Sequence, residues 1–359
     1  MQYRNVDILA QETVADSGTK SIDLDVTDPI TELTVILDLK NGAAKVDEHL
    51  PTDVVTNIEI VDGGTVYASM TGAEAAAIFT YQTGHYPIHW FSETLSENQS
   101  ATLPIRFGRF LGDPLRNFNP TRLRNPQLKV TWAKDAQHLT AYVKLTVKAR
   151  LMDGEAGAAS CLLTKGVRSF TTAGSGIEST ELPTDYPIRN LYVRGYVAGA
   201  CPRNVLSHWK LDCDEGKFIA FDMSGEDMQN EVERIYGLFE VRQNVQASNA
   251  DKIQAWLGSV YSGSGAIAGG AYTTQFWASA NPYGVIYGSD YNGAAFDDQK
   301  VEINGRGSLP HSMFAVPFGL PDDPATWFNA AAYRKVKLNL TQGESDCDCR
   351  ILVQQDRPM

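Results

Sequence analysis

The sequence predicts an all-β protein made of two similar halves, and two observations lead to this prediction. Most of its 359 residues fall into segments of roughly five to nine residues with alternating or β-branched apolar side chains, separated by Gly, Pro, Asn and Asp. Blocks of the first half then recur in the same order in the second half. At roughly 150 residues per domain, the length suits about two domains.

The composition is that of an acidic globular protein. Its 31 Lys and Arg stand against 43 Asp and Glu, a formal net charge of −12. This acidic balance lacks the basic character of a protein that binds the phosphate backbone, so we expect no direct sequence-specific binding of nucleic acid. No window has the roughly 18 apolar residues of a membrane-spanning helix, and the start lacks the apolar core of a secretory signal. We therefore expect the chain to fold in the cytosol.

Local signals place the elements of the first half. The turn Asp62-Gly63-Gly64 favours a hairpin, because glycine adopts positive φ without steric cost. Thr71 followed three residues later by Glu74 is the capping box of a helix over about residues 72–79. Strands are predicted over residues 21–26, 31–39, 54–61, 65–70, 86–91, 101–107, 128–132 and 139–149.

Three blocks suggest the duplication. Residues 30–35 match 188–193, and the strand, Asp/Gly turn and strand of residues 57–67 match 208–219, which lead into a helix capped by Ser224. The third block aligns residues 102–104 with 308–310 and so sets Phe107 near Phe314. Three matches in one order indicate two copies of one fold.

The halves differ by a long insertion after the second helix. It spans about residues 246–306 and is rich in Gly, Ser, Ala, Tyr and Trp, a composition typical of functional or surface loops. Residues 153–160 are small, polar and unpatterned. We therefore predict a first domain over residues 1–155 and a second over residues 156–359 that carries the insertion.

No catalytic, cofactor-binding or metal-binding motif is present. The six His form no HxH or HExxH pair, and His85 and His89 flank Pro87, so we expect turn or surface histidines there. The five Cys have no CxxC spacing, which predicts buried free thiols. Cys347 and Cys349 alternate with acidic residues, as on one face of a strand. We expect no cofactor, no metal and no enzymatic activity.

Eight strands and a capped helix, repeated twice, resemble the double jelly-roll major capsid proteins of tailless icosahedral viruses, the tectivirus, corticovirus and adenovirus-hexon lineage. The resemblance covers the whole chain and depends on repeat order rather than on a short motif. It implies two tandem eight-stranded jelly-roll β-sandwiches, each with a short flanking helix. It further implies a homotrimer, the pseudo-hexameric capsomer that tiles an icosahedral shell.

The resemblance also implies the surroundings of the chain. It places the chain in a virion shell assembled in the host cytoplasm. The implied partners are copies of the chain itself, with penton or minor capsid proteins. An internal lipid membrane is left open, with residues 1–13 as the segment that would face it.

Two groups of residues are candidates for contacts in such a shell. A locally basic stretch and a later acidic turn are candidates for subunit interfaces: Arg109, Arg116, Arg122, Arg124, Asp322 and Asp323. In the capsid proteins that the chain resembles, insertions after the helices often rise as outer towers. Aromatic residues of the insertion are therefore candidates for an exposed tower loop, or else for packing against their own roll: Tyr261, Tyr272, Trp277, Tyr283 and Tyr287.

Two other classes of function stay open at this point. The first is a double β-sandwich enzyme similar to the amidases that remove N-linked glycans, which would require a buried acidic cleft where the rolls meet. The second is a carbohydrate- or receptor-binding protein, which only the aromatic insertion supports.

Overall fold

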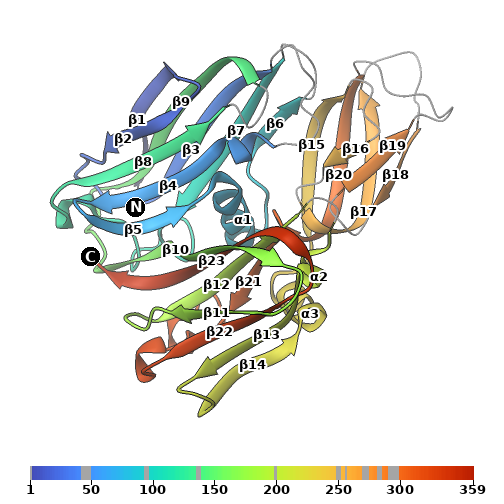
Figure 1. Cartoon of the computed structure of the whole chain (residues 1–359). Helices are drawn as coiled ribbons and strands as arrows, with labels where there is room; N and C mark the ends of the chain where they lie inside the picture. Colours follow the sequence, from blue (N-terminus) through green and yellow to red (C-terminus); the bar gives the residue numbers. More distant parts are fainter. Residues whose placement is uncertain are drawn as a thin grey trace.

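The computed structural model describes residues 2–41, 50–92, 97–134, 139–197, 200–247, 252–254, 257–268, 275–280, 285–289 and 299–359. In these ranges, strands form sheets of eleven, eight and four strands. Figure 1 shows the two halves of the chain as separate groups of strands, with a third group standing beside the first half. The all-β prediction is therefore confirmed.

The first half is a sandwich of two four-stranded faces. One face has the order β1-β9-β3-β7 and the other β2-β8-β4-β5. The strands pair antiparallel throughout, and their inward side chains form the core. The bounds are β1 Gln2–Val14, β2 Ser17–Asp23, β3 Ile30–Asn41, β4 Val55–Asp62, β5 Thr65–Met70, β7 Asn98–Arg106, β8 Pro126–Ala133 and β9 Leu139–Asp153.

The second half repeats this order strand by strand. One face is β10-β23-β12-β21 and the other is β11-β22-β13-β14. Both halves have the crossed strand order of a jelly roll, so the predicted fold of two tandem jelly rolls is confirmed. The bounds are β10 Ser160–Ala173, β11 Ile177–Leu182, β12 Ile188–Tyr196, β13 Leu206–Cys213, β14 Phe218–Ser224, β21 Met313–Pro317, β22 Val336–Gln342 and β23 Ser345–Pro358.

Each roll carries a helix after its fifth strand. Helix α1 (Gly72–Thr83) begins with the predicted capping box, in which Thr71 Oγ1 accepts from Glu74 N and Glu74 Oε2 accepts from Thr71 N. Helix α3 (Gly225–Tyr236) is capped by Ser224. Both caps are confirmed. The other helical elements of the described ranges are a short helix α2 (Pro202–Val205) and the 3-10 turns Pro51–Val54, Pro120–Arg122, Pro324–Thr326 and Ala330–Ala332.

The sequence prediction missed strand β1. It assigned the first strand to residues 21–26 and set residues 1–13 aside as an inward contact, whereas Gln2–Val14 pairs with β9 along its length. Most residues of this strand are exposed, because it lies at the edge of its sheet. An edge strand buries few side chains and therefore shows a weak apolar alternation.

The third repeat block was aligned in the wrong register. Leu103 pairs with Val35 and Phe314 pairs with Val193, so Leu103 and Phe314 are equivalent. Phe107 then corresponds to Phe318, four residues beyond the predicted partner. The sequence match misled because residues 308–310 belong to strand β20 of the extra sheet and precede the strand that completes the second roll.

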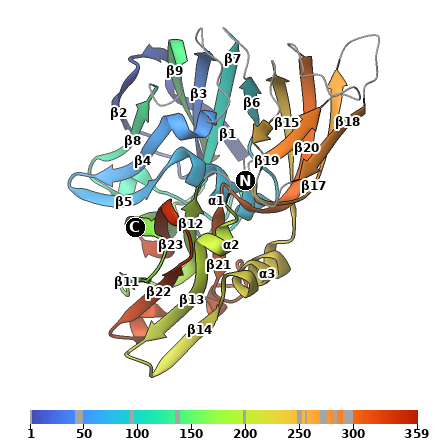
Figure 2. The same ribbon diagram turned by 45° about the vertical axis from the view of Figure 1, so that its right-hand side comes forward.

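The extra strands follow α3 and extend the eleven-stranded sheet beyond the first roll. Their order is β15-β20-β17-β18-β19-β16, and β6 (His89–Ser92) of the first half links them to β7 and runs parallel to β15. We call this part of the sheet the extra sheet. Figures 1 and 2 show this sheet beside the first roll and above α2 and α3. The predicted insertion falls within these strands. Their bounds are β15 Phe239–Ala247, β16 Lys252–Gln254, β17 Leu257–Ala268, β18 Gln275–Ala280, β19 Val285–Ser289 and β20 Gln299–Pro310.

The connection between the rolls is short. Strand β9 ends at Asp153 and β10 begins at Ser160, and the predicted boundary near residue 155 falls between them. The chain returns to this place at its end, since Met359 N donates to Ala159 O at 3.0 Å. The division into two domains stays a prediction.

The five thiols are free and buried, as predicted. Cys347 and Cys349 lie in β23 with buried side chains, and the acidic residues between and before them are exposed. The alternation expected of a strand is therefore confirmed. Burial raises the pKa of Cys213 to about 11 and of Cys349 to about 12.

Candidate assembly surfaces

The two rolls meet edge to edge within the chain. Strand β5 of the first roll and β10 of the second lie parallel, with Ser69 opposite Lys165. Leu162 N donates to Phe107 O at 2.8 Å, and Gly166 N donates to Ser69 Oγ at 3.1 Å. The fifth strand of one roll and the first strand of the next therefore form a continuous seam.

A tyrosine of helix α1 ties the first roll to the second. Tyr81 Oη donates to Met313 O at 2.6 Å, and its ring lies edge-on to Tyr236 and Phe239, with centroids 4.9 and 5.3 Å away. Burial raises the pKa of Tyr81 well above its usual value, so the hydroxyl stays protonated and remains a donor.

Arg109 of the first roll contacts the second roll. Its Nε lies 2.6 Å from Asp113 Oδ2, and its Nη1 donates to Asp322 O at 3.2 Å. Burial alone would raise the pKa of Asp113, but hydrogen bonds from Arg109 and from backbone amides outweigh it and lower that pKa. The charged pair therefore persists at neutral pH and holds Arg109 toward the second roll.

Arg116 also reaches from the first roll into the second. Its Nη2 lies 2.7 Å from Asp356 Oδ2, and its guanidinium lies over the Trp327 ring at 4.8 Å. Little of either charged side chain is exposed, so removal of one partner would leave the other charge buried and uncompensated, and the cation–π contact is stronger than at the surface.

The remaining candidates lie on the same end of the molecule. Arg122 Nη1 makes a long contact of 3.5 Å to Met359 O. The backbone amide of Arg124 donates to Asp62, and Asp323 Oδ1 accepts from Ala325 N at 3.1 Å. Arg109, Arg116 and Asp322 thus have partners inside the chain, in contacts that join its two rolls. A role of any of the six in contacts between subunits stays a prediction.

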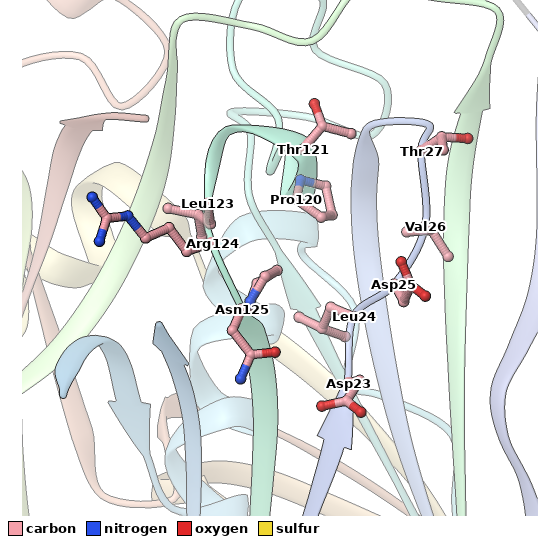
Figure 3. Close-up of a pocket in the computed structure, with 11 residues that line it drawn as sticks. Asp23, Leu24, Asp25, Val26, Thr27, Pro120, Thr121, Leu123, Arg124 and Asn125 are labelled. Carbon is pink, nitrogen blue, oxygen red and sulfur yellow. The ribbon is translucent and has the colours of Figure 1, made fainter. Parts of the chain in front are cut away.

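A polar groove lies at this end of the first roll. It encloses about 390 Å³ between the segment after β2 and the segment before β8. Figure 3 shows Asp23 and Asp25 on one wall and Arg124 on the other, with the arginine side chain pointing away from both carboxylates. Such an arrangement offers no converging donor set for a metal or a catalytic acid pair.

The tower candidates lie in the extra sheet or outside the described residues. Tyr261 of β17 is half exposed, and its hydroxyl donates to Glu233 Oε1 of α3 at 2.8 Å. Trp277 pairs with Ser289 and Tyr287 with Ser279 in the β18–β19 hairpin. Tyr272 and Tyr283 lie outside the described residues. The exposure of a tower loop stays a prediction.

A cluster of two histidines and a tyrosine lies where the extra sheet joins the rolls. The Tyr86 hydroxyl contacts His311 Nε2 at 2.5 Å, and the Tyr86 ring packs on His89 with centroids 5.1 Å apart. Burial lowers the pKa of His89 to about 4 and that of His311 well below its usual value. The prediction of turn or surface histidines is wrong for His89, whose ring the fold encloses although Pro87 precedes it.

Neither a metal cluster nor a membrane-spanning helix occurs among the described residues. The described ranges contain no group of three or more His, Cys, Asp or Glu arranged to hold a metal ion. Within the same ranges, no helix is both long and apolar enough to cross a membrane.

The two rolls and their edge-to-edge seam define a double jelly-roll protein, and solved structures of the same architecture exist. No family model and no curated protein matches the sequence. The STIV major capsid protein matches with a TM-score of 0.57 and 12% identity, over 99% of this chain and 96% of that one.

Two further structures give the same result. The major capsid protein P2 of Bacteriophage PM2 matches with a TM-score of 0.55 and 10% identity, over 99% of this chain and 98% of that one. A chain of the PBCV-1 virus capsid matches with a TM-score of 0.55 and 12% identity, over 99% and 93%. The chain therefore shares the fold of these capsid proteins, and the predicted resemblance is confirmed at the level of fold.

Proposed function

We propose that this chain is the major shell protein of an icosahedral virion and that it has a structural rather than a catalytic function. The observation that carries the proposal is the side-by-side placement of two equivalent rolls in one chain. A ring of three such chains presents six similar blocks, a near-sixfold unit that tiles a flat facet. The full-length likeness to three viral capsid chains supports the same function.

The finer features of the proposal follow from this role. The proposed oligomer is a homotrimer. Each of its three chains has a first domain over residues 1–155 and a second over residues 156–359. In the shell, the extra sheet over β15–β20 forms the tower, and penton or minor capsid proteins fill positions that trimers do not. We assign assembly to the host cytoplasm.

The solution mass of the purified protein tests this function. We expect light scattering to give a stable species of three 39.4 kDa chains, and electron images of the same peak to show a hexagonal outline. A stable monomer at high protein concentration would contradict the proposal. It would favour the glycan-active enzyme or the binding protein instead, and a deglycosylation assay would separate those two.

A further inference from the structure

Each roll carries an equivalent pair of phenylalanines whose rings contact each other, tilted in the first roll and stacked in the second. Phe107 N donates to Thr31 O and Phe318 N donates to Arg189 O, both at 3.3 Å. Phe118 and Phe328 each exchange two backbone hydrogen bonds with the first residue of β3 or β12. The ring centroids lie 5.0 Å apart in the first roll and 4.8 Å apart in the second.

The two pairs differ in what covers them. Phe107 and Phe118 are 1% and 0% exposed, and the first residues of β10 lie against them through the bond from Leu162 N to Phe107 O. Phe318 and Phe328 are only partly buried. They continue into a row of stacked rings that ends at Phe218, which is 45% exposed on β14. A row of aromatic rings that is only partly covered and ends at an exposed phenylalanine is typical of a contact surface.

Tyr3 is the residue of the first roll that corresponds to Leu162. Leu162 pairs with Asp356 and Tyr3 pairs with Met152. Asp356 and Met152 are equivalent, because the amide of each donates to the proline that precedes β12 or β3. Leu162 is 1% exposed, whereas Tyr3 is 50% exposed. The chain therefore has a second set of the two surfaces that meet at the seam, Phe318 on the second roll and Tyr3 on β1. Within one chain these two surfaces do not contact each other.

These two surfaces lie at edge strands of different sheets, β1 and β14. Strand β1 is the last strand at one end of the eleven-stranded sheet, and β14 is the last strand at one end of the four-stranded sheet. Figure 1 shows β1 at the outer edge of the first roll, at the upper left, and β14 at the bottom of the molecule. Within one chain, these two strands do not meet.

We propose that β1 of a second copy lies on the second roll as β10 lies on the first, with Tyr3 of that copy against Phe318. The seam between rolls is then repeated between chains, from β14 of one copy to β1 of the next. Such a contact is heterologous, so each copy uses a different surface toward each neighbour, and three copies form a closed ring when each contact turns the chain by one third of a full turn. This inference rests on the proposed self-assembly and names its surfaces.

Disulfide trapping tests the contact directly. The N–H···O bond between Leu162 and Phe107 brings two backbones within reach of a disulfide, so Tyr3→Cys with Phe318→Cys should link neighbouring chains under mild oxidation. The native thiols are buried and give little background. We expect a ladder of covalent dimers and trimers in a non-reducing gel, which neither single variant gives.

Two matched pairs control the experiment. Ser69→Cys with Lys165→Cys joins strands that pair within the chain, so it should form an intrachain disulfide with no ladder. Tyr3→Cys with Ile177→Cys places the second thiol on β11, at the opposite end of the four-stranded sheet from β14, and should give no ladder. A ladder from this second pair would overturn the assigned surface.

A substitution that leaves Phe318 intact gives an independent readout. Tyr3→Ser should weaken association by on the order of tenfold, because interface tyrosines often contribute strongly to binding. Ile88→Ser, at an 86% exposed apolar side chain elsewhere, should leave association unchanged. An intact wild-type trimer with no Tyr3–Phe318 ladder would overturn the inference and leave the proposed function standing. A monomeric wild type would overturn both.

Discussion

Arg350 Nε lies 3.0 Å from Oε1 of Glu74, a fully buried carboxylate whose other oxygen caps helix α1. Arg350 belongs to the second roll and Glu74 to the first, so one side chain both starts a helix and joins the two rolls. Loss of the arginine would leave this buried carboxylate without a compensating positive charge.

Removal of that partner should destabilise the whole chain. We expect Arg350→Ala to lower the free energy of unfolding by about 3 kcal/mol, because the buried Glu74 carboxyl group loses its partner. Urea unfolding measures the change. Arg168→Ala, which removes a pair exposed on the arginine side, should cost under about 1 kcal/mol. Equal losses in the two variants would contradict the assigned role of Glu74.

The same aspartate contact occurs in both rolls and predicts matched effects. Asp62 accepts from the amides of Arg124 and Asn125, and Asp214 accepts from those of Arg334 and Lys335. Asp62→Asn and Asp214→Asn should each lower the free energy of unfolding by roughly 1 to 2 kcal/mol, because a neutral side chain accepts weaker hydrogen bonds from the backbone amides than a carboxylate does.

Hydrogen exchange at the receiving amides locates that effect. Asp62→Asn should speed exchange at Asn125 and leave Lys335 unchanged, and Asp214→Asn should do the reverse. Asp25→Ala, at an exposed side chain of the polar groove, serves as the control and should change neither amide. Unchanged exchange at both amides in both variants would refute the contact.

The enclosed histidines predict a loss of stability in acid. The pKa of His89 is lowered to about 4 by burial, whereas an unfolded histidine titrates near 6.5. As pH falls below about 6.5, the unfolded chain therefore binds a proton that the folded chain does not, and stability decreases until about pH 4. At pH 5, this effect of His89 should lower the free energy of unfolding by about 2 kcal/mol relative to neutral pH.

A variant isolates this contribution from that of the carboxylates. His89→Asn should lose less stability than the wild type between pH 7 and pH 5, as measured by the pH dependence of thermal unfolding. His85→Asn replaces an exposed histidine and should follow the wild-type profile. Parallel profiles for His89→Asn and the wild type would show that His89 is not enclosed as a neutral ring.

The buried thiols predict slow chemical modification. Desolvation raises the pKa of Cys161, Cys201, Cys213, Cys347 and Cys349, so little thiolate exists at pH 8. A disulfide-exchange reagent should leave the native protein unmodified and should react with all five thiols in strong denaturant. Rapid reaction of any thiol in the native protein would contradict its burial.

The sequence predicted features that depend on neighbouring residues. The capping box at Thr71 and Glu74, the hairpin at Gly63 and the alternation around Cys347 all follow from local spacing, and each has the expected structure. The three sequence blocks that recur in the second half then predicted that the chain contains two copies of the same fold.

The features that sequence analysis missed depend on contacts between distant residues. Strand β1 buries too few side chains to show its alternation, and the register of Phe318 follows from its bond to Arg189. His89 is enclosed because the extra sheet joins the first roll beside it. The sequence around Arg109 and Arg116 gave no local sign that these side chains contact Asp322 and Asp356 in the other half of the same chain.

The central claim is that two equivalent rolls in one chain let three copies form a ring of six. Averaged electron images of the purified oligomer test this most directly. The account predicts a closed particle with six roll-sized lobes and threefold symmetry, in which extra density marks every second lobe because only the second half carries the extra strands. A particle with twofold symmetry, or single two-lobed chains, would contradict it.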